Sequence, residues 1–238
     1  HGGRNRWTSD AFKNFNQISV SVQDHLKKVY LTLCCALVAS VAGAYFHLLW
    51  NIGGFLTTVG FLGSIIWLFT VPVYEEKKRM SLLMAAGLFE GACLGPLIEL
   101  AIDIDSSILV SAFVGSALAF GCFSMAAMVA RRREYLYLGG ALASALSILT
   151  WLQFASAVFG GPMALFKFEI YFGLLLFVGY VVFDTQYIIE KAHAGDMDYV
   201  RHAIMLYTDF VAIFVRVLVI MLRNASDKEE DKRRKNKR

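Results

Sequence analysis

The feature that most constrains this chain is a series of seven apolar runs, each about twenty residues long. They lie at about 29–50, 53–71, 80–102, 107–130, 135–158, 168–190 and 202–223. A helix of roughly 20 apolar residues crosses a hydrocarbon core of about 30 Å. We therefore expect an all-α integral membrane protein whose core is a seven-helix transmembrane bundle.

Composition agrees with a membrane protein. Of the 238 residues, 57% are hydrophobic and 18% are charged, whereas soluble domains carry about 25% charged residues. Three regions are expected: a cytosolic N-terminal segment at 1–28, the transmembrane bundle at 29–223, and a basic disordered tail at 224–238. Residues 1–28 are too polar for the apolar centre of a signal peptide, so the first membrane helix would itself act as the signal.

Basic residues alternate between the connections of the seven runs. Thirteen Lys and Arg lie in 1–28 and in the connections near 72–79, 131–134 and 191–201. The intervening connections hold a single one, Lys167. Because cytosolic loops carry the excess of Lys and Arg, the sequence predicts a multi-pass protein with a cytosolic N-terminus.

The tail departs from this pattern, since 224–238 holds seven Lys and Arg. A seventh run that crosses fully places the tail on the non-cytosolic side, against the charge rule. A re-entrant last helix, which enters the membrane and returns, keeps the tail in the cytosol. Both alternatives stay open at the level of the sequence.

Four ionisable residues lie well inside the apolar runs: Glu90, Asp184, Asp209 and Arg216. Each costs about 2.5–3.5 kcal/mol at the membrane centre on insertion scales, so each is a candidate functional residue. Glu90, six residues before Pro96, is expected to line an ion path or to remain a protonated structural acid. Arg216 is a candidate charge partner for an acid, or else extends its charged end toward the membrane surface.

Asp184 and Asp209 are predicted to form a pair. Asp184 lies twelve residues before Asp196 and Asp209 twelve after Met197, so in an antiparallel helical hairpin both lie at the same depth, roughly 11 Å inside the helix ends. Two facing carboxyl groups would share one proton and titrate as a unit. We expect a pH sensor and gate that also binds Ca²⁺ weakly through carboxylate oxygens. The alternative is that each Asp bonds only a nearby hydroxyl or backbone group.

The sequence contains no motif for disulfide bonding, zinc binding or proteolysis. The four cysteines form no C-x-x-C and the five histidines no H-E-x-x-H, so neither a disulfide framework, nor a zinc site, nor metal catalysis is expected. Intramembrane aspartyl proteases require G-x-G-D, and the nearest string here is HAGD at 193–196. The chain is therefore expected not to be an enzyme, with Ca²⁺ as a transported ion rather than a cofactor.

Partners are expected at the membrane and at the tail. The basic cluster Lys232, Arg233, Arg234 and Lys235 favours contact with anionic lipid or with a calcium-sensor protein such as calmodulin. Other membrane proteins are further candidates, and nucleic acid is not.

Several long motifs carry a resemblance: EGACLGPLIE, ARRREYLYLGG, WLQFASAVFGG and FVGYVVFDTQYIIEKAHAGDMDYVRHAI. From about Trp7 to Ala225 the chain resembles the Bax inhibitor-1 family, and plant members most of all. The resemblance implies an endoplasmic-reticulum membrane protein that suppresses programmed cell death under stress through a pH-sensitive calcium leak. It also places the family's paired aspartates at Asp184 and Asp209 and its membrane acid at Glu90. The alternative is a membrane scaffold that acts through partners bound at its tail, without transport.

Overall fold

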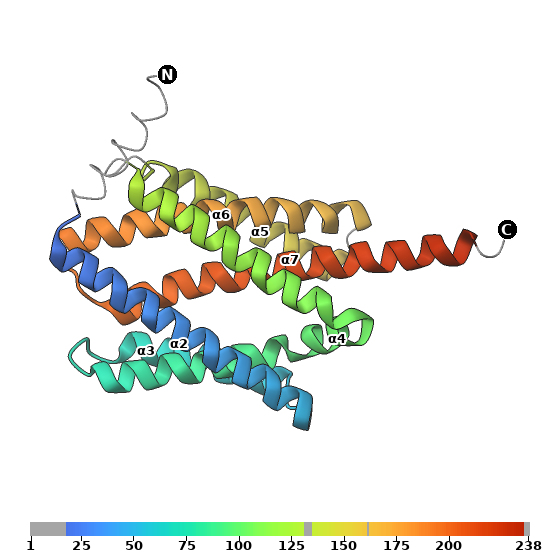
Figure 1. Ribbon diagram of the computed structural model, residues 1–238, viewed down its shortest axis with the longest axis horizontal. Helices are drawn as coiled ribbons and strands as arrows, with labels where there is room; N and C mark the ends of the chain where they lie inside the picture. The colour runs from blue at the N-terminus through green and yellow to red at the C-terminus, as the bar shows by residue number, and fades with distance from the viewer. Residues whose placement is uncertain (1–17, 131–134, 161, 236–238) are drawn as a thin grey trace, which may run out of the picture. The chain divides into compact units, whose positions relative to one another are not determined.

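The computed structural model describes residues 18–130, 135–160 and 162–235, and within these ranges it contains helices and no strand (Figure 1). The helices are α2 (Val20–Trp50), α3 (Phe55–Thr70), α4 (Glu76–Val129), α5 (Leu138–Phe159), α6 (Met163–His193) and α7 (Tyr199–Lys235). These six helices cover most of the seven apolar runs, so the structure shows the expected helices as six elements and does not reproduce the count of seven. The expected all-α class is confirmed.

The helix bounds differ from the expected ones at three places. Helix α2 begins at Val20 rather than near residue 29, and it includes part of the segment expected to precede the bundle. The third and fourth runs form one element, α4, interrupted only at Asp105. Helix α7 continues to Lys235, so the tail to that point is helical where disorder was expected. Residues 1–17 lie outside the described part of the chain.

Asp105 interrupts α4 because its backbone is extended, with φ −167° and ψ 115°. Its carboxylate accepts a hydrogen bond from the Ser107 backbone N–H at 2.8 Å. That arrangement is the usual N-cap of a helix, in which a short polar side chain satisfies a free backbone donor. A second helical stretch therefore starts at this point.

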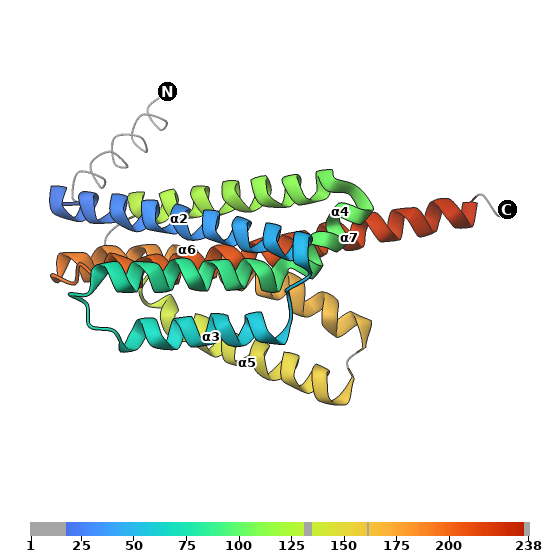
Figure 2. The ribbon, with the colours of Figure 1, turned by 90° about the horizontal axis from the view of Figure 1, so that it is seen from below.

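The chain forms two compact units, and unit 2 comprises residues 21–109 and 196–207. In it, α2 packs on the first part of α4 through glycines. A Cβ on Gly91 would collide with the Ser40 backbone carbonyl, and one on Gly43 would collide with that of Leu88. Figure 2 shows α3 beside the same part of α4. Small residues that allow such close backbone approach are typical of membrane helix pairs.

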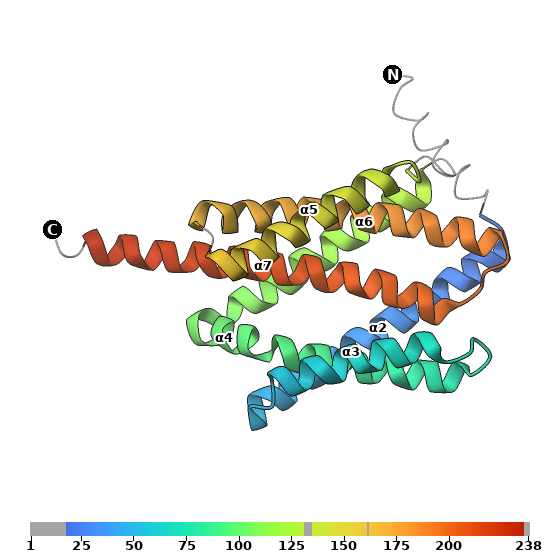
Figure 3. The same cartoon turned by 180° about the vertical axis from the view of Figure 1, so that it is seen from behind.

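Unit 1 comprises residues 110–195 and 208 onward. Here α6 lies beside both α5 and α7 (Figure 3). The second part of α4 contacts α7 through Phe113 and Phe120, whose rings lie 5.9 and 5.6 Å from that of Phe210. It contacts α6 through a hydrogen bond of 3.1 Å between the hydroxyls of Ser124 and Thr185.

In the described ranges, five helices are long and apolar enough to cross a membrane, and α3 is a shorter apolar helix of 16 residues. Large apolar side chains are exposed along them: Phe55 is 86% exposed and Trp151 is 70% exposed. A soluble protein rarely exposes apolar surface on this scale. The fold is that of a multi-pass helical membrane protein.

Candidate functional site: an acid pair in unit 1 and a polar network in unit 2

Asp184 on α6 and Asp209 on α7 lie against each other in unit 1. Both side chains are buried, and their carboxyl groups hydrogen-bond to one another. This acid pair has the geometry expected from the equal depth of the two residues. An ionised carboxylate only accepts hydrogen bonds, so a bond between two carboxyl groups requires a proton on at least one of them.

The acid pair is not fully satisfied. One oxygen of Asp209, Oδ2, is buried and accepts no hydrogen bond from an N–H or O–H donor of the described residues. A buried acceptor without a donor is costly, so a proton held between the two carboxyl groups lowers that cost. The sequence could not identify that oxygen, because its isolation depends on the packing around α7.

The two residues that follow Asp184, Thr185 and Gln186, hydrogen-bond α6 to the second part of α4 and to Tyr135. Thr185 bonds Ser124, as described above. The amide of Gln186 donates to the Ala127 carbonyl at 3.3 Å and accepts from the Tyr135 backbone N–H at 2.9 Å. The sequence analysis did not select Thr185 or Gln186, although three polar residues in succession after an apolar run are a usable signal.

Glu90 lies in unit 2, on the first part of α4. It is close enough to Tyr207 to interact electrostatically with its hydroxyl. Ser40 donates to the Ala36 carbonyl at 3.0 Å, so in the 2.7 Å contact with Ser40 it is Tyr207 that donates. The described contacts of Glu90 thus belong to a different unit from the acid pair.

Arg216 forms no ion pair with a described residue. Its Nη1 donates to the Ala212 carbonyl at 2.9 Å, and its guanidinium lies 4.5 Å from the ring centroid of Phe177. Of the two alternatives that the sequence left open for Arg216, pairing with an acid is not observed in the described part of the chain.

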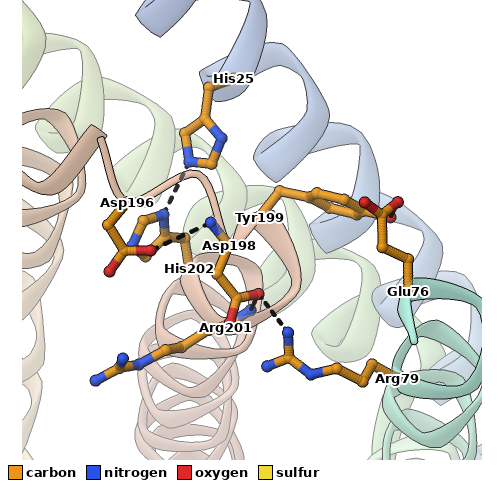
Figure 4. A network of polar contacts seen from close by, with 8 residues as sticks. All are labelled: His25, Glu76, Arg79, Asp196, Asp198, Tyr199, Arg201 and His202. Carbon is orange, nitrogen blue, oxygen red and sulfur yellow. Dashed lines mark hydrogen bonds and ion pairs between the residues drawn. The ribbon is translucent and has the colours of Figure 1, made fainter. Parts of the chain in front are cut away.

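The connection between α6 and α7 carries a polar network that the sequence analysis missed (Figure 4). His25 Nε2 and His202 Nδ1 are 2.8 Å apart, so one ring donates and the other accepts. Arg79 Nη1 donates to Asp198 Oδ1 at 2.7 Å, with both side chains buried. The Tyr199 hydroxyl donates to Glu76 at 3.2 Å. All these residues belong to unit 2, so the network joins residues 196–207 to α2 and α4.

Asp198 is held in its ionised form. Burial alone raises the pKa of a carboxyl group, but here the hydrogen bond from Arg79, the Arg201 backbone N–H and the charges of Arg79 and His202 outweigh it. The pKa of Asp198 therefore lies below its usual value. No sequence motif marks this residue, because Arg79 is 119 positions away along the chain.

Among the described residues no group of three or more His, Cys, Asp or Glu side chains could hold a metal ion. Ca²⁺ takes six to eight oxygen ligands, and the acid pair supplies four oxygens at most. Four oxygens are too few to complete a Ca²⁺ coordination shell, so this pair alone does not form a permanent Ca²⁺ site. The tail residues Lys232 to Lys235 have no described side chains.

The fold and the acid pair define a multi-pass helical membrane protein with buried acids on neighbouring helices. Residues 22–227 match the protein family described as inhibitor of apoptosis-promoting Bax1. Bax inhibitor 1 of Arabidopsis thaliana is 66% identical over 227 residues, which cover 95% of this chain and 92% of that protein. The Homo sapiens Bax inhibitor 1 is 42% identical over 228 residues, covering 94% and 96%. The chain belongs to this family of membrane inhibitors of apoptosis, and the resemblance seen in its motifs is confirmed.

Proposed function

We propose that this protein suppresses programmed cell death by acting as a pH-sensitive calcium leak in the endoplasmic-reticulum membrane, with its N-terminus in the cytosol. The observation that carries the proposal is the buried hydrogen bond between Asp184 and Asp209 in a member of a family of apoptosis inhibitors. The alternating basic connections support the orientation. A leak of this kind lowers the calcium content of the store without catalysing a reaction.

The acid pair supplies a mechanism for the pH sensitivity. With a shared proton, the hydrogen bond holds α6 against α7. Loss of that proton leaves two carboxylates in contact, which repel each other strongly where little water screens them. The helices then separate at this level, or a cation enters and neutralises both charges. Acid therefore closes the leak, and a higher pH opens it.

The test is Ca²⁺ flux into liposomes that contain the purified protein, measured from acid to neutral pH. If one proton controls opening, flux rises up to about tenfold per pH unit below the midpoint. Asp209→Asn should give low flux at every pH, because an amide donates to the remaining carboxylate whether or not a proton is present. Asp103→Asn, an exposed acid outside the pair, should behave like the wild type. An Asp209→Asn profile identical to that of the wild type contradicts the mechanism.

A second candidate function is a scaffold that acts through partners, without transport. One observation favours it: α7 continues as a helix to Lys235, which presents the tail as an ordered element. Deletion of 224–238 separates the two functions, since a scaffold would lose cell-death suppression while Ca²⁺ flux survives.

The same flux samples, incubated with an apolar peptide, test for an aspartyl protease, whose cleavage products would vanish in Asp184→Ala.

A further inference from the structure

We propose that Arg216 is the fixed positive charge that limits Ca²⁺ passage between α6 and α7 and sets the ion selectivity of the leak. The inference rests on the proposed leak function and adds a specificity-determining residue to it. It starts from position. Arg216 lies seven residues after Asp209, which is two helical turns or about 10 Å along α7. In the proposed leak, a cation that moves along this helix pair on the side of the acid pair away from the α6–α7 connection passes Arg216.

The side chain of Arg216 is held in place on three sides. Its Nη1 donates to the carbonyl of Ala212, one turn back toward Asp209. The ring of Phe177, seven residues before Asp184 on α6, lies under the guanidinium at 4.5 Å. Gly173, one turn further along α6, leaves the space that the side chain occupies, because a Cβ there would collide with Arg216 Nε. An arginine fixed in this way cannot move aside freely.

The charge of Arg216 is also not cancelled. Both of its contacts, a carbonyl and an aromatic ring, are neutral groups that favour a cation without removing its charge. No ion pair to Arg216 occurs in the described ranges. Guanidinium keeps its proton at any physiological pH. The buried acid on the same part of α6, Glu169, instead accepts a hydrogen bond from Ser156 at 3.0 Å.

A fixed charge acts on ions in proportion to their own charge, since Coulomb energy is a product of the two. The repulsion of Ca²⁺ by Arg216 is thus twice that of K⁺ in free energy, and the effect on Ca²⁺ flux is the square of the effect on K⁺ flux. If Arg216→Gln raises K⁺ flux about threefold, it raises Ca²⁺ flux about tenfold. This squared relation separates electrostatic control from a simple widening of the path, which would raise both by the same factor.

The experiment measures Ca²⁺ and K⁺ flux in liposomes for the wild type, Arg216→Gln, Arg216→Lys and Arg223→Gln. Lys keeps the charge and should leave the Ca²⁺ to K⁺ ratio within about twofold of the wild type. Arg223, whose guanidinium lies over Phe166 near the start of α6, is the matched arginine. It lies fourteen residues after Asp209, or about 20 Å along α7, and should change the ratio by less than about twofold because charge interactions weaken with distance. Arg216→Met replaces the Gln variant if the latter does not fold, as judged by thermal melting and elution volume.

Each outcome decides a separate point. Higher flux with a larger gain for Ca²⁺ supports the selectivity role. A conducting wild type with unchanged or equally raised fluxes in Arg216→Gln overturns it and leaves the leak intact. A silent wild type beside a conducting Arg216→Gln rejects the leak for the native chain and supports the barrier. If neither protein conducts, the leak and the selectivity role both fail.

Discussion

At the scale of single residues, the ion pair of Arg79 and Asp198 gives a testable link between structure and pH. The pKa of Asp198 is lowered in the folded protein, so its contribution to stability is fully present above the unfolded aspartate pKa of about 3.9. That contribution is lost as the pH falls through the folded value. Asp198→Asn should cost about 2 kcal/mol at neutral pH, since charged hydrogen bonds are worth about 1.5–3 kcal/mol.

Thermal melting in detergent across pH checks this expectation. The difference between wild type and Asp198→Asn should shrink below about pH 4, where the wild-type carboxyl is also neutral. Asp24→Asn is the matched control, because the Asp24–Lys27 pair has a similar length of 2.9 Å but side chains that are 60% and 76% exposed. Exposed pairs contribute about 0–1 kcal/mol. Equal losses in the two variants would show that burial of the Arg79–Asp198 pair adds nothing.

At the scale of helices, the packing of α2 on α4 depends on glycine. In Gly91→Ala the new Cβ meets the backbone of Ser40 rather than a flexible side chain, so α2 must move away. Overpacking of this kind costs about 1–3 kcal/mol. Gly115→Ala is the matched change on the same helix, with no atom within 4 Å of the new Cβ. It should be neutral or slightly stabilising, because alanine favours helix over glycine. The melting temperatures of Gly91→Ala and Gly115→Ala test this expectation, and equal values would refute glycine-dependent packing.

The helices themselves were largely predictable, and their ends were not. Apolar runs of membrane length determine where helices form, whatever their neighbours. The sequence predicted a loop at 103–106 between the third and fourth runs. In the structure, the helix is interrupted only at Asp105, whose extended backbone ends one helical stretch and whose carboxylate caps the next. The tail contains closely spaced acidic and basic residues in DKEEDKRRK, which can support a helix through i to i+4 pairs. The hydropathy pattern that predicted the other helices does not include such charge pairs, so it did not predict a helix in the tail.

At the scale of the whole molecule, antiparallel symmetry made the acid pair predictable, because equal distance from one connection places two residues at equal depth. The network around His25 and His202 offered no such rule. These residues are 177 positions apart, and they meet because residues 196–207 join the unit formed by α2, α3 and the first part of α4. Contacts of that separation depend on how the helices pack, which a single sequence does not specify.

The length of α7 predicts on which side of the membrane the tail lies. Its 37 residues form a helix without the turn that a re-entrant segment requires, and at 1.5 Å per residue it is about 55 Å long, against a hydrocarbon core of about 30 Å. The connection at 194–198 and the residues after 228 should therefore lie on opposite sides. In the proposed orientation, with the connection in the cytosol, the tail should lie on the side of the calcium store. Against this stands the positive-inside rule, which seven basic residues in the tail would break.

Labelling of single cysteines shows whether the tail lies on the side predicted by the length of α7 or on the side predicted by the positive-inside rule. In a chain whose native cysteines are replaced by serine, Met197→Cys and Asp227→Cys are labelled in sealed microsomes with a reagent that cannot cross membranes. Labelling at 197 alone, with 227 labelled only after detergent, places the tail inside the store, where a cytosolic calcium sensor cannot reach it. The scaffold function would then need a partner within the store. Labelling of both residues before detergent would show that α7 does not cross, and the basic tail would be free to meet cytosolic partners.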